Sequence, residues 1–134
     1  LNPDHDQKGL VWYAPLIPMR SSNVREFLTM AEKILTAYQF DFSITLINFS
    51  WRCFDGTLLL QYDRTNPADC ARAMQCYEAL FTEGMKLGFV PYRVGLQGMK
   101  LLVDETTPFW NIARDIKHAL DPNGIISSGR YSLS

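Results

Sequence analysis

The order of two hydrophobic periodicities along the chain constrains the fold more than any other feature. Two segments repeat apolar residues at helical spacing, 24–38 and 67–87. Four shorter segments are rich in β-branched and aromatic residues, as strands are: 10–18, 42–49, 57–62 and 89–94. The order strand, helix, strand, strand, helix, strand is typical of the ferredoxin-like split βαβ arrangement. We therefore expect an α+β fold with both helices on one face of the sheet, whose other face needs a partner.

Local signals mark the ends of both helical segments. Ser22 or Asn23 can cap the first helix, because their side chains can accept hydrogen bonds from the first-turn amides. Asn66 is the expected cap of the second helix, with Pro67 as its first residue. Gly88 is placed to end that helix.

The strand segments carry two further signals. Asp55-Gly56 lies between the second and third strands, which predicts a hairpin with this dipeptide in its connection. Pro15 interrupts the first strand and indicates an edge position or a bulge there.

A third amphipathic segment follows the ferredoxin-like pattern. Thr107 is expected to cap this last helix and Pro108 to begin it, and the chain turns at 121–124. Its apolar stripe predicts a buried face: Phe109, Ile112, Ala113, Ile116 and Leu120. We expect 1–134 to be one fragment of a larger protein, in which 10–94 is the ferredoxin-like portion and 95–134 a helix and tail.

The charge pattern excludes several classes of partner. Thirteen basic and fourteen acidic residues give a net charge of −1, without the basic stripe that nucleic-acid or membrane-surface binding needs. The apolar runs are far shorter than the ~20 residues of a membrane-spanning helix.

Few residues suggest catalysis on their own. The three cysteines, Cys53, Cys70 and Cys76, fit no metal spacing, so no metal site is expected and free, buried or half-buried thiols are. Free thiols favour a reducing compartment, so we expect a cytoplasmic protein, with the periplasm as the alternative. Neither His5 nor His118 has the partners of a catalytic triad nearby in the sequence.

Four stretches together resemble a known family. LDPNGIISSGRYS (120–132), FVPYRVG (89–95), GLVWYAPLIP (9–18) and YDRTNP (62–67) are similar to the C-terminal part of FAD-linked oxidases of the vanillyl-alcohol oxidase and p-cresol methylhydroxylase type. The resemblance implies that this chain is the cap, or substrate, portion of an FAD-dependent enzyme. A flavin-binding domain outside these residues would then be its partner. A second copy of this chain and a cytochrome c subunit are further candidate partners, although no residue here indicates the cytochrome.

The resemblance assigns roles to two pairs of residues. Tyr92 and Arg93 match a tyrosine–arginine pair that holds the phenolate oxygen of a para-substituted phenol. Gly129 and Arg130 match a glycine and a basic residue beside the flavin, where the positive charge stabilises the reduced ring. The alternatives are that Tyr92 packs on the helices, that Arg93 extends into solvent, and that Arg130 is an ordinary surface residue.

At three positions the chain departs from the family pattern. Leu10 stands where vanillyl-alcohol oxidase has its flavin-linking histidine, so we expect FAD to be bound noncovalently. Thr45 and Asp55 stand where the hydroxylase branch has an active-site glutamate and histidine. Asp55, Cys53 and Arg52 are the candidate replacements for that lost chemistry.

These observations lead to one hypothesis and two rivals. The parent enzyme is expected to oxidise a para-substituted phenol or related alcohol by hydride transfer to flavin, with the fragment alone inactive. Within the enzyme class, the rival substrate is a non-phenolic alcohol or hydroxy acid. From another class, the rival is a non-catalytic ferredoxin-like module for binding or oligomerisation.

Overall fold

The computed structural model describes residues 5–131. The chain divides into two compact units, Leu1–Val94 and Gly95–Ser134, and each is described by itself.

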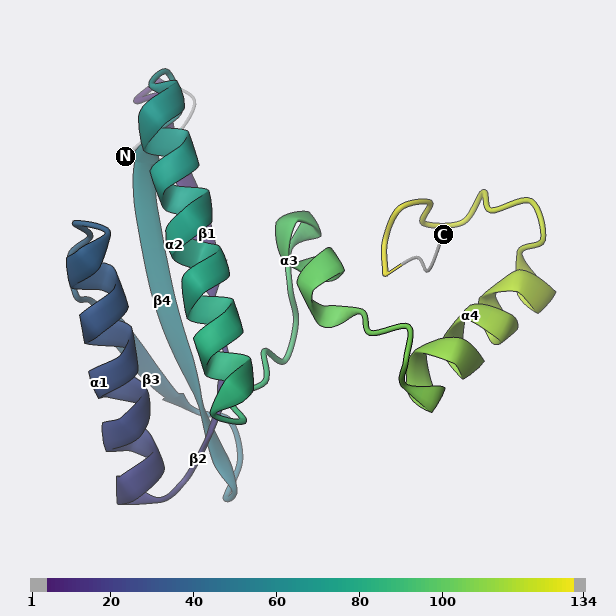
Figure 1. Ribbon diagram of the computed structural model, residues 1–134, viewed down its shortest axis with the longest axis horizontal. Coiled ribbons are helices and arrows are strands. Elements are labelled where there is room, and N and C mark those ends of the chain that lie inside the picture. The colour runs from purple at the N-terminus through teal and green to yellow at the C-terminus, as the bar shows by residue number, and fades with distance from the viewer. Residues whose placement is uncertain (1–4, 132–134) are drawn as a thin grey trace. The chain divides into compact units, whose positions relative to one another are not determined.

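The first unit consists of a small antiparallel sheet and two long helices, which lie side by side against it (Figure 1). In chain order its elements are β1 (Lys8–Tyr13), β2 (Leu16–Pro18), α1 (Ser21–Ala37), β3 (Ile44–Asn48), β4 (Cys53–Asp63) and α2 (Pro67–Lys86). The expected α+β, ferredoxin-like fold class is confirmed by this arrangement.

Strand β4 organises the sheet because β1, β2 and β3 all pair with it, antiparallel. Asp55 pairs with Leu16 of β2 and also with Ile47 of β3, so β2 and β3 lie on opposite edges of β4. Leu58 likewise pairs with Tyr13 of β1 and with Ile44 of β3. Strands β1 and β2 therefore form one edge in a common register, interrupted near Pro15 as expected.

The expectation of a regular strand over 89–94 is wrong. The segment is reduced to a single bridge between Pro15 and Pro91, flanked by two backbone hydrogen bonds. The Leu16 amide donates to the Val90 carbonyl at 2.9 Å, and the Tyr92 amide donates to the Ala14 carbonyl at 3.4 Å. Proline is rare inside regular paired strands, and here Pro91 lies in the middle of the expected strand.

The hairpin is confirmed, but its expected turn at Asp55-Gly56 is wrong. The connection runs over 49–52, where the amides of Phe49 and Ser50 both donate to the Cys53 carbonyl at 3.2 Å. Asp55 and Gly56 lie inside β4, because the register continues to Asn48 opposite Phe54. A dipeptide that favours turns was therefore overridden by strand pairing on both sides.

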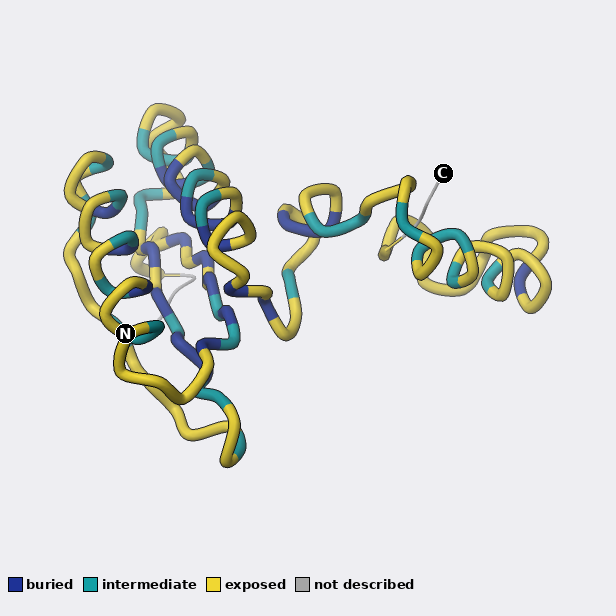
Figure 2. The backbone as a smooth tube through the Cα atoms, turned by 60° about the horizontal axis from the view of Figure 1, so that its bottom comes forward, coloured by how far each residue is buried: buried dark blue, intermediate teal, exposed yellow. Residues whose placement is uncertain are grey.

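Helices α1 and α2 bury their apolar stripes against one face of the sheet, and the buried residues follow these contacts (Figure 2). The largest buried side chains there include Tyr13, Phe27, Tyr77, Phe81 and Phe89. The Tyr13 ring lies 6.5 Å from that of Phe27 and 6.3 Å from that of Tyr77. Aromatic burial of this kind supplies most of the packing energy of a small core.

The helix ends follow the sequence only in part. The Asn66 side chain caps α2 as expected, accepting from the Ala68 amide at 3.0 Å and the Asp69 amide at 3.4 Å. Helix α1 begins two or three residues earlier than expected, because Arg20 rather than Ser22 or Asn23 is its N-cap residue, and it has no side-chain cap. Gly88 follows α2 with φ of +82°, a conformation that glycine adopts without strain.

The second unit contains two helices: α3 (Leu96–Leu102), which the sequence did not predict, and α4 (Pro108–Leu120), which it did. The expected burial of the α4 stripe is wrong, since Phe109, Ile112, Ile116 and Leu120 are 55–77% exposed. The helical spacing was right, but the described part of the chain offers this stripe no apolar surface to cover it. Thr107 precedes α4 without a side-chain cap bond.

Two expectations about the chain as a whole can be checked. The three cysteines are free thiols, with Cys76 buried and the other two half-buried, as expected. Within the described residues, no helix combines the length and the apolar character needed to cross a membrane.

Candidate functional site

The face of the sheet away from the helices, called the open face below, carries the candidate site. A side chain on Gly56 would meet Ile17 and Phe27, so this residue faces α1. Side chains alternate along a strand, so Asp55, Thr57 and Leu59 point the other way.

The open face is mostly apolar and exposed. Trp12 of β1 pairs with Leu59 of β4, and these side chains are 51% and 41% exposed. Leu10 on the same side of β1 is 48% exposed, and Ile47 of β3 is 50% exposed. Apolar side chains gathered on one surface are typical of a binding face.

Tyr92 also lies on the open face. The bridged Pro15 and Pro91 are buried, so the residues on either side of Pro91 face the opposite way, and Tyr92 is 39% exposed. The Tyr92 ring lies against Phe49, with ring centroids 5.5 Å apart. The Arg93 guanidinium lies 5.4 Å from the centroid of the Tyr92 ring, at the distance of a cation–π contact. Phe49 was not singled out from the sequence.

Asp55 is the one carboxylate of the open face that is buried, being only 6% exposed. Burial raises the pKa of its carboxyl, while a hydrogen bond from the Thr57 side chain and the positive charge of Arg93 oppose that rise. The structure thus brings Tyr92, Arg93 and Asp55 into one neighbourhood.

The positions at which this chain departs from the family pattern lie on the same surface. Thr45 of β3 pairs with Thr57 of β4, and paired residues project to the same side of a sheet. Leu10, Thr45 and Asp55 therefore share the open face with Tyr92. Of the three candidate replacements, only Asp55 is buried there, since Cys53 is half-buried and Arg52 lies exposed in the 49–52 connection beside the Trp51 ring.

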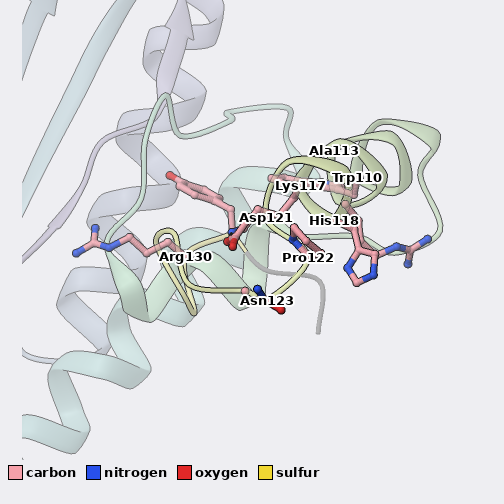
Figure 3. Close-up of a pocket in the computed structure, with 11 residues that line it drawn as sticks. Trp110, Ala113, Lys117, His118, Asp121, Pro122, Asn123 and Arg130 are labelled. Atoms are coloured by element: carbon pink, nitrogen blue, oxygen red, sulfur yellow. The ribbon is translucent and has the colours of Figure 1, made fainter.

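The other predicted pair, Gly129 and Arg130, lies in the second unit. Arg130 lines a pocket of about 550 Å³ together with residues of α4 and the following loop (Figure 3). Its side chain extends away from Asp121 and His118. Gly129 has φ of +77°, so backbone conformation alone accounts for glycine at this position.

The pocket of the second unit is built around Asp121, which is 7% exposed. Its carboxylate accepts hydrogen bonds from the amides of Ile125 at 2.9 Å and Ile126 at 2.8 Å, and pairs with Lys117. The Lys117 interaction and these amide bonds lower the pKa of Asp121. The Trp110 and Tyr131 rings stack with centroids 6.2 Å apart. These contacts order the tail on which Gly129 and Arg130 sit.

Two characterised proteins are similar to the chain over nearly all of its length. The 1'-carboxy-chondrochloren decarboxylase of Chondromyces crocatus is 33% identical over 132 residues, which are 98% of this chain and 24% of that protein. The 4-cresol dehydrogenase (hydroxylating) flavoprotein subunit of Pseudomonas putida is 32% identical over 126 residues, 93% of this chain and 24% of that subunit. This chain is homologous to part of a flavoprotein.

The resemblance to FAD-linked oxidases inferred from four short stretches is thereby confirmed. The chain spans about a quarter of the length of the curated relatives it matches. No protein-family model matches it.

Sequence reasoning placed Asp55 in the wrong local structure and missed Phe49 as its neighbour. A usable signal was present, because Asp55, Thr57 and Leu59 alternate with Gly56, Leu58 and Leu60. Reading β4 back to Cys53 would have put the carboxyl inside a strand. The roles of Tyr92, Arg93, Gly129 and Arg130 stay predictions.

Proposed function

We propose that this chain is the C-terminal substrate-domain segment of an FAD-dependent oxidoreductase acting on a para-substituted phenol or a related alcohol. One observation carries the proposal. A chain homologous to part of a 4-cresol dehydrogenase flavoprotein subunit gathers Tyr92, Arg93 and a buried Asp55 on an apolar, exposed sheet face. The flavin-binding portion is the proposed partner of this segment and lies outside these residues.

The open face suits a flat aromatic cofactor. Leu10, Trp12 and Leu59 offer an apolar surface against which a flavin ring can pack. Leu10 has no nucleophilic atom, so binding at this face would be noncovalent, as expected from the sequence. For Gly129 and Arg130 the family resemblance is the support for a role in flavin binding, in which the guanidinium would stabilise the negative charge of the reduced ring. When bound, FAD accepts a hydride from the substrate carbon.

The substrate would be held by the residues beside Asp55. The Arg93 guanidinium stays protonated and would donate to the phenolate oxygen, with the Tyr92 hydroxyl as a second donor. The exposed Phe49 ring, already in contact with Tyr92, would pack against the substrate ring. Negative charge that develops on the phenol oxygen during oxidation would be stabilised by the same two groups.

The test is a binding titration of the flavoprotein that carries this segment. 4-Cresol and toluene are titrated separately while the flavin absorbance spectrum is recorded, because toluene lacks only the hydroxyl. We expect Arg93→Ala to weaken 4-cresol binding about 10–100-fold, the range for losing a hydrogen bond to a charged group. Arg25→Ala removes an exposed arginine of α1; it is the matched control and should leave binding unchanged. Unchanged 4-cresol binding in Arg93→Ala would remove the basis of the proposal.

Decarboxylation is a second candidate, favoured by the 33% identity to a decarboxylase over 98% of this chain. Arg93 would then hold a substrate carboxylate, which it can bind through two parallel hydrogen bonds. Release of carbon dioxide from a 4-hydroxyphenyl carboxylic acid, measured with the flavin-loaded protein, would favour this reaction over oxidation of a phenol.

A further inference from the structure

Asp55 differs from every other residue of the open face in its exposure. Trp12, Ile47 and Leu59 are 41–51% exposed, whereas Asp55, in the middle of the same surface, is 6% exposed. A carboxylate normally lies in water, and burial without full hydrogen bonding costs free energy. Contact with water therefore cannot be the reason for a carboxyl at position 55, and its burial needs another explanation.

The burial of Asp55 is explained by the side chains that surround it. In the sheet it has Leu16 of β2 on one side and Ile47 of β3 on the other. Phe49 follows β3 at one edge of β4, and Tyr92 lies beside the β1–β2 edge. The ring contact between Phe49 and Tyr92 therefore spans the strand that carries Asp55. The carboxyl is therefore buried close to two aromatic rings that are themselves partly exposed.

One oxygen of this carboxyl is left without a donor. Among the described residues, Oδ1 of Asp55 is buried and has no hydrogen-bond partner. Buried polar atoms are almost always paired, and one left unpaired costs more than its hydrogen bond would gain. A donor supplied by a bound molecule would remove this cost.

We infer that Asp55 is a substrate-recognition residue, whose Oδ1 accepts a hydrogen bond from a hydroxyl group of an aromatic ligand packed against Phe49 and Tyr92. This inference rests on the proposed function of the open face. It narrows the substrate class to phenols with a second hydroxyl, one oxygen held by Arg93 and the other donating to Asp55. An ionised carboxylate only accepts hydrogen bonds, so a methoxy group at the second position is disfavoured.

The experiment compares three ligands that differ only at the second position: 4-cresol, 4-methylcatechol and 2-methoxy-4-methylphenol. Each is titrated into the flavoprotein that carries this segment, with dissociation constants measured calorimetrically and from the flavin spectrum. We expect 4-methylcatechol to bind about tenfold more tightly than 4-cresol, the gain from one hydrogen bond to a charged group. The methoxy compound should bind more weakly than the catechol.

Variants separate recognition from folding. Asp55→Ala should abolish the preference for 4-methylcatechol, so that this ligand and 4-cresol bind the variant with similar dissociation constants. Asp55→Asn, which keeps an acceptor oxygen but no charge, should retain part of the preference. Asp41→Ala removes an exposed carboxyl before β3 and is the matched control, with the preference intact.

The outcomes distinguish this inference from the function on which it rests. If 4-cresol binds through Arg93 but the catechol preference is absent, or survives in Asp55→Ala, the role of Asp55 is overturned and the phenol site stands. If none of the three ligands binds, both proposals are wrong.

Discussion

The two faces of one sheet behave in opposite ways. Neighbouring residues of β4 supply both, yet Leu58 and Leu60 are at most 1% exposed whereas Leu59 between them is 41% exposed. On the helix side, α1 packs on β2 and α2 packs on β1 and β4, and aromatic rings surround that of Tyr13. On the open face, apolar side chains stay exposed and the buried group is a carboxyl. One face holds the packed core of the unit, and the other is the face on which we propose that substrate and flavin bind.

The largest expected effect separates the faces with a pair of identical substitutions. Leu60→Ala should lower the free energy of unfolding by about 2–5 kcal/mol, because it leaves a cavity in the core. Leu59→Ala, one residue away on the open face, should change it by about 0.5 kcal/mol or less. Urea unfolding followed by circular dichroism measures both. Equal losses would mean that the open face is also part of the stabilising core.

A second prediction tests how tightly the helix side is packed. Gly84 of α2 lies against the Tyr13 hydroxyl, and a side chain there would collide with it. Gly84→Ala should therefore cost about 1–3 kcal/mol of stability, the usual penalty of overpacking.

The hydroxyl of Tyr13 provides the control for this effect. That buried oxygen has no hydrogen-bond partner among the described residues, so Tyr13→Phe should cost little. Combined with Gly84→Ala, it should recover part of the lost stability in a double-mutant cycle. If the losses of unfolding free energy of the two single variants simply add in the double variant, the two side chains do not collide.

The smallest expected effect concerns the cost of the buried carboxyl on the open face. The pKa of Asp55 is raised in the folded protein, so the folded state holds this proton more tightly than the unfolded state. The contribution of Asp55 to stability therefore falls as the pH rises above the unfolded value of about 3.9 through the folded pKa. Asp55→Asn should stabilise the protein, and by more at pH 7 than at pH 4.

The measurement is the difference in unfolding free energy between wild type and Asp55→Asn across that pH range. Taking the difference matters because Asp63 and Asp69, whose pKa values are lowered, make stability change in the opposite direction with pH. A difference that does not vary with pH would contradict the raised pKa of Asp55. We expect Asp55→Asn to be more stable than the wild type and less selective for 4-methylcatechol, since residues kept for function often lower stability.

Much of the fold was predictable because its signals are local. Helical spacing located α1, α2 and α4, and the asparagine–proline pair located the start of α2. Strand-like composition predicted the hairpin but not the position of its turn. The dipeptide Asp55-Gly56 favours a turn, but here strands pair with β4 on both sides of Asp55. The bridge at Pro91 and the exposed stripe of α4 depend on which surfaces meet, which spacing along the chain does not specify.

The candidate site, like the fold, was predictable from the sequence only in part. The residue types at Tyr92-Arg93 and Gly129-Arg130 were readable from motifs, as was the absence of a flavin-linking side chain at Leu10. Their neighbours were not. Phe49 is 43 residues from Tyr92 in the sequence, and only strand pairing brings their rings to 5.5 Å.

By itself, the sequence determined the order of the elements as far as the end of α2 and the resemblance to FAD-linked oxidases. These follow from periodicity and short motifs, which act over a few residues. Only the tertiary structure decided that Asp55 is buried, that one of its oxygens lacks a donor, and that it lies near Arg93. Burial and electrostatic environment arise from contacts between distant segments, and therefore exist only once the sheet has formed.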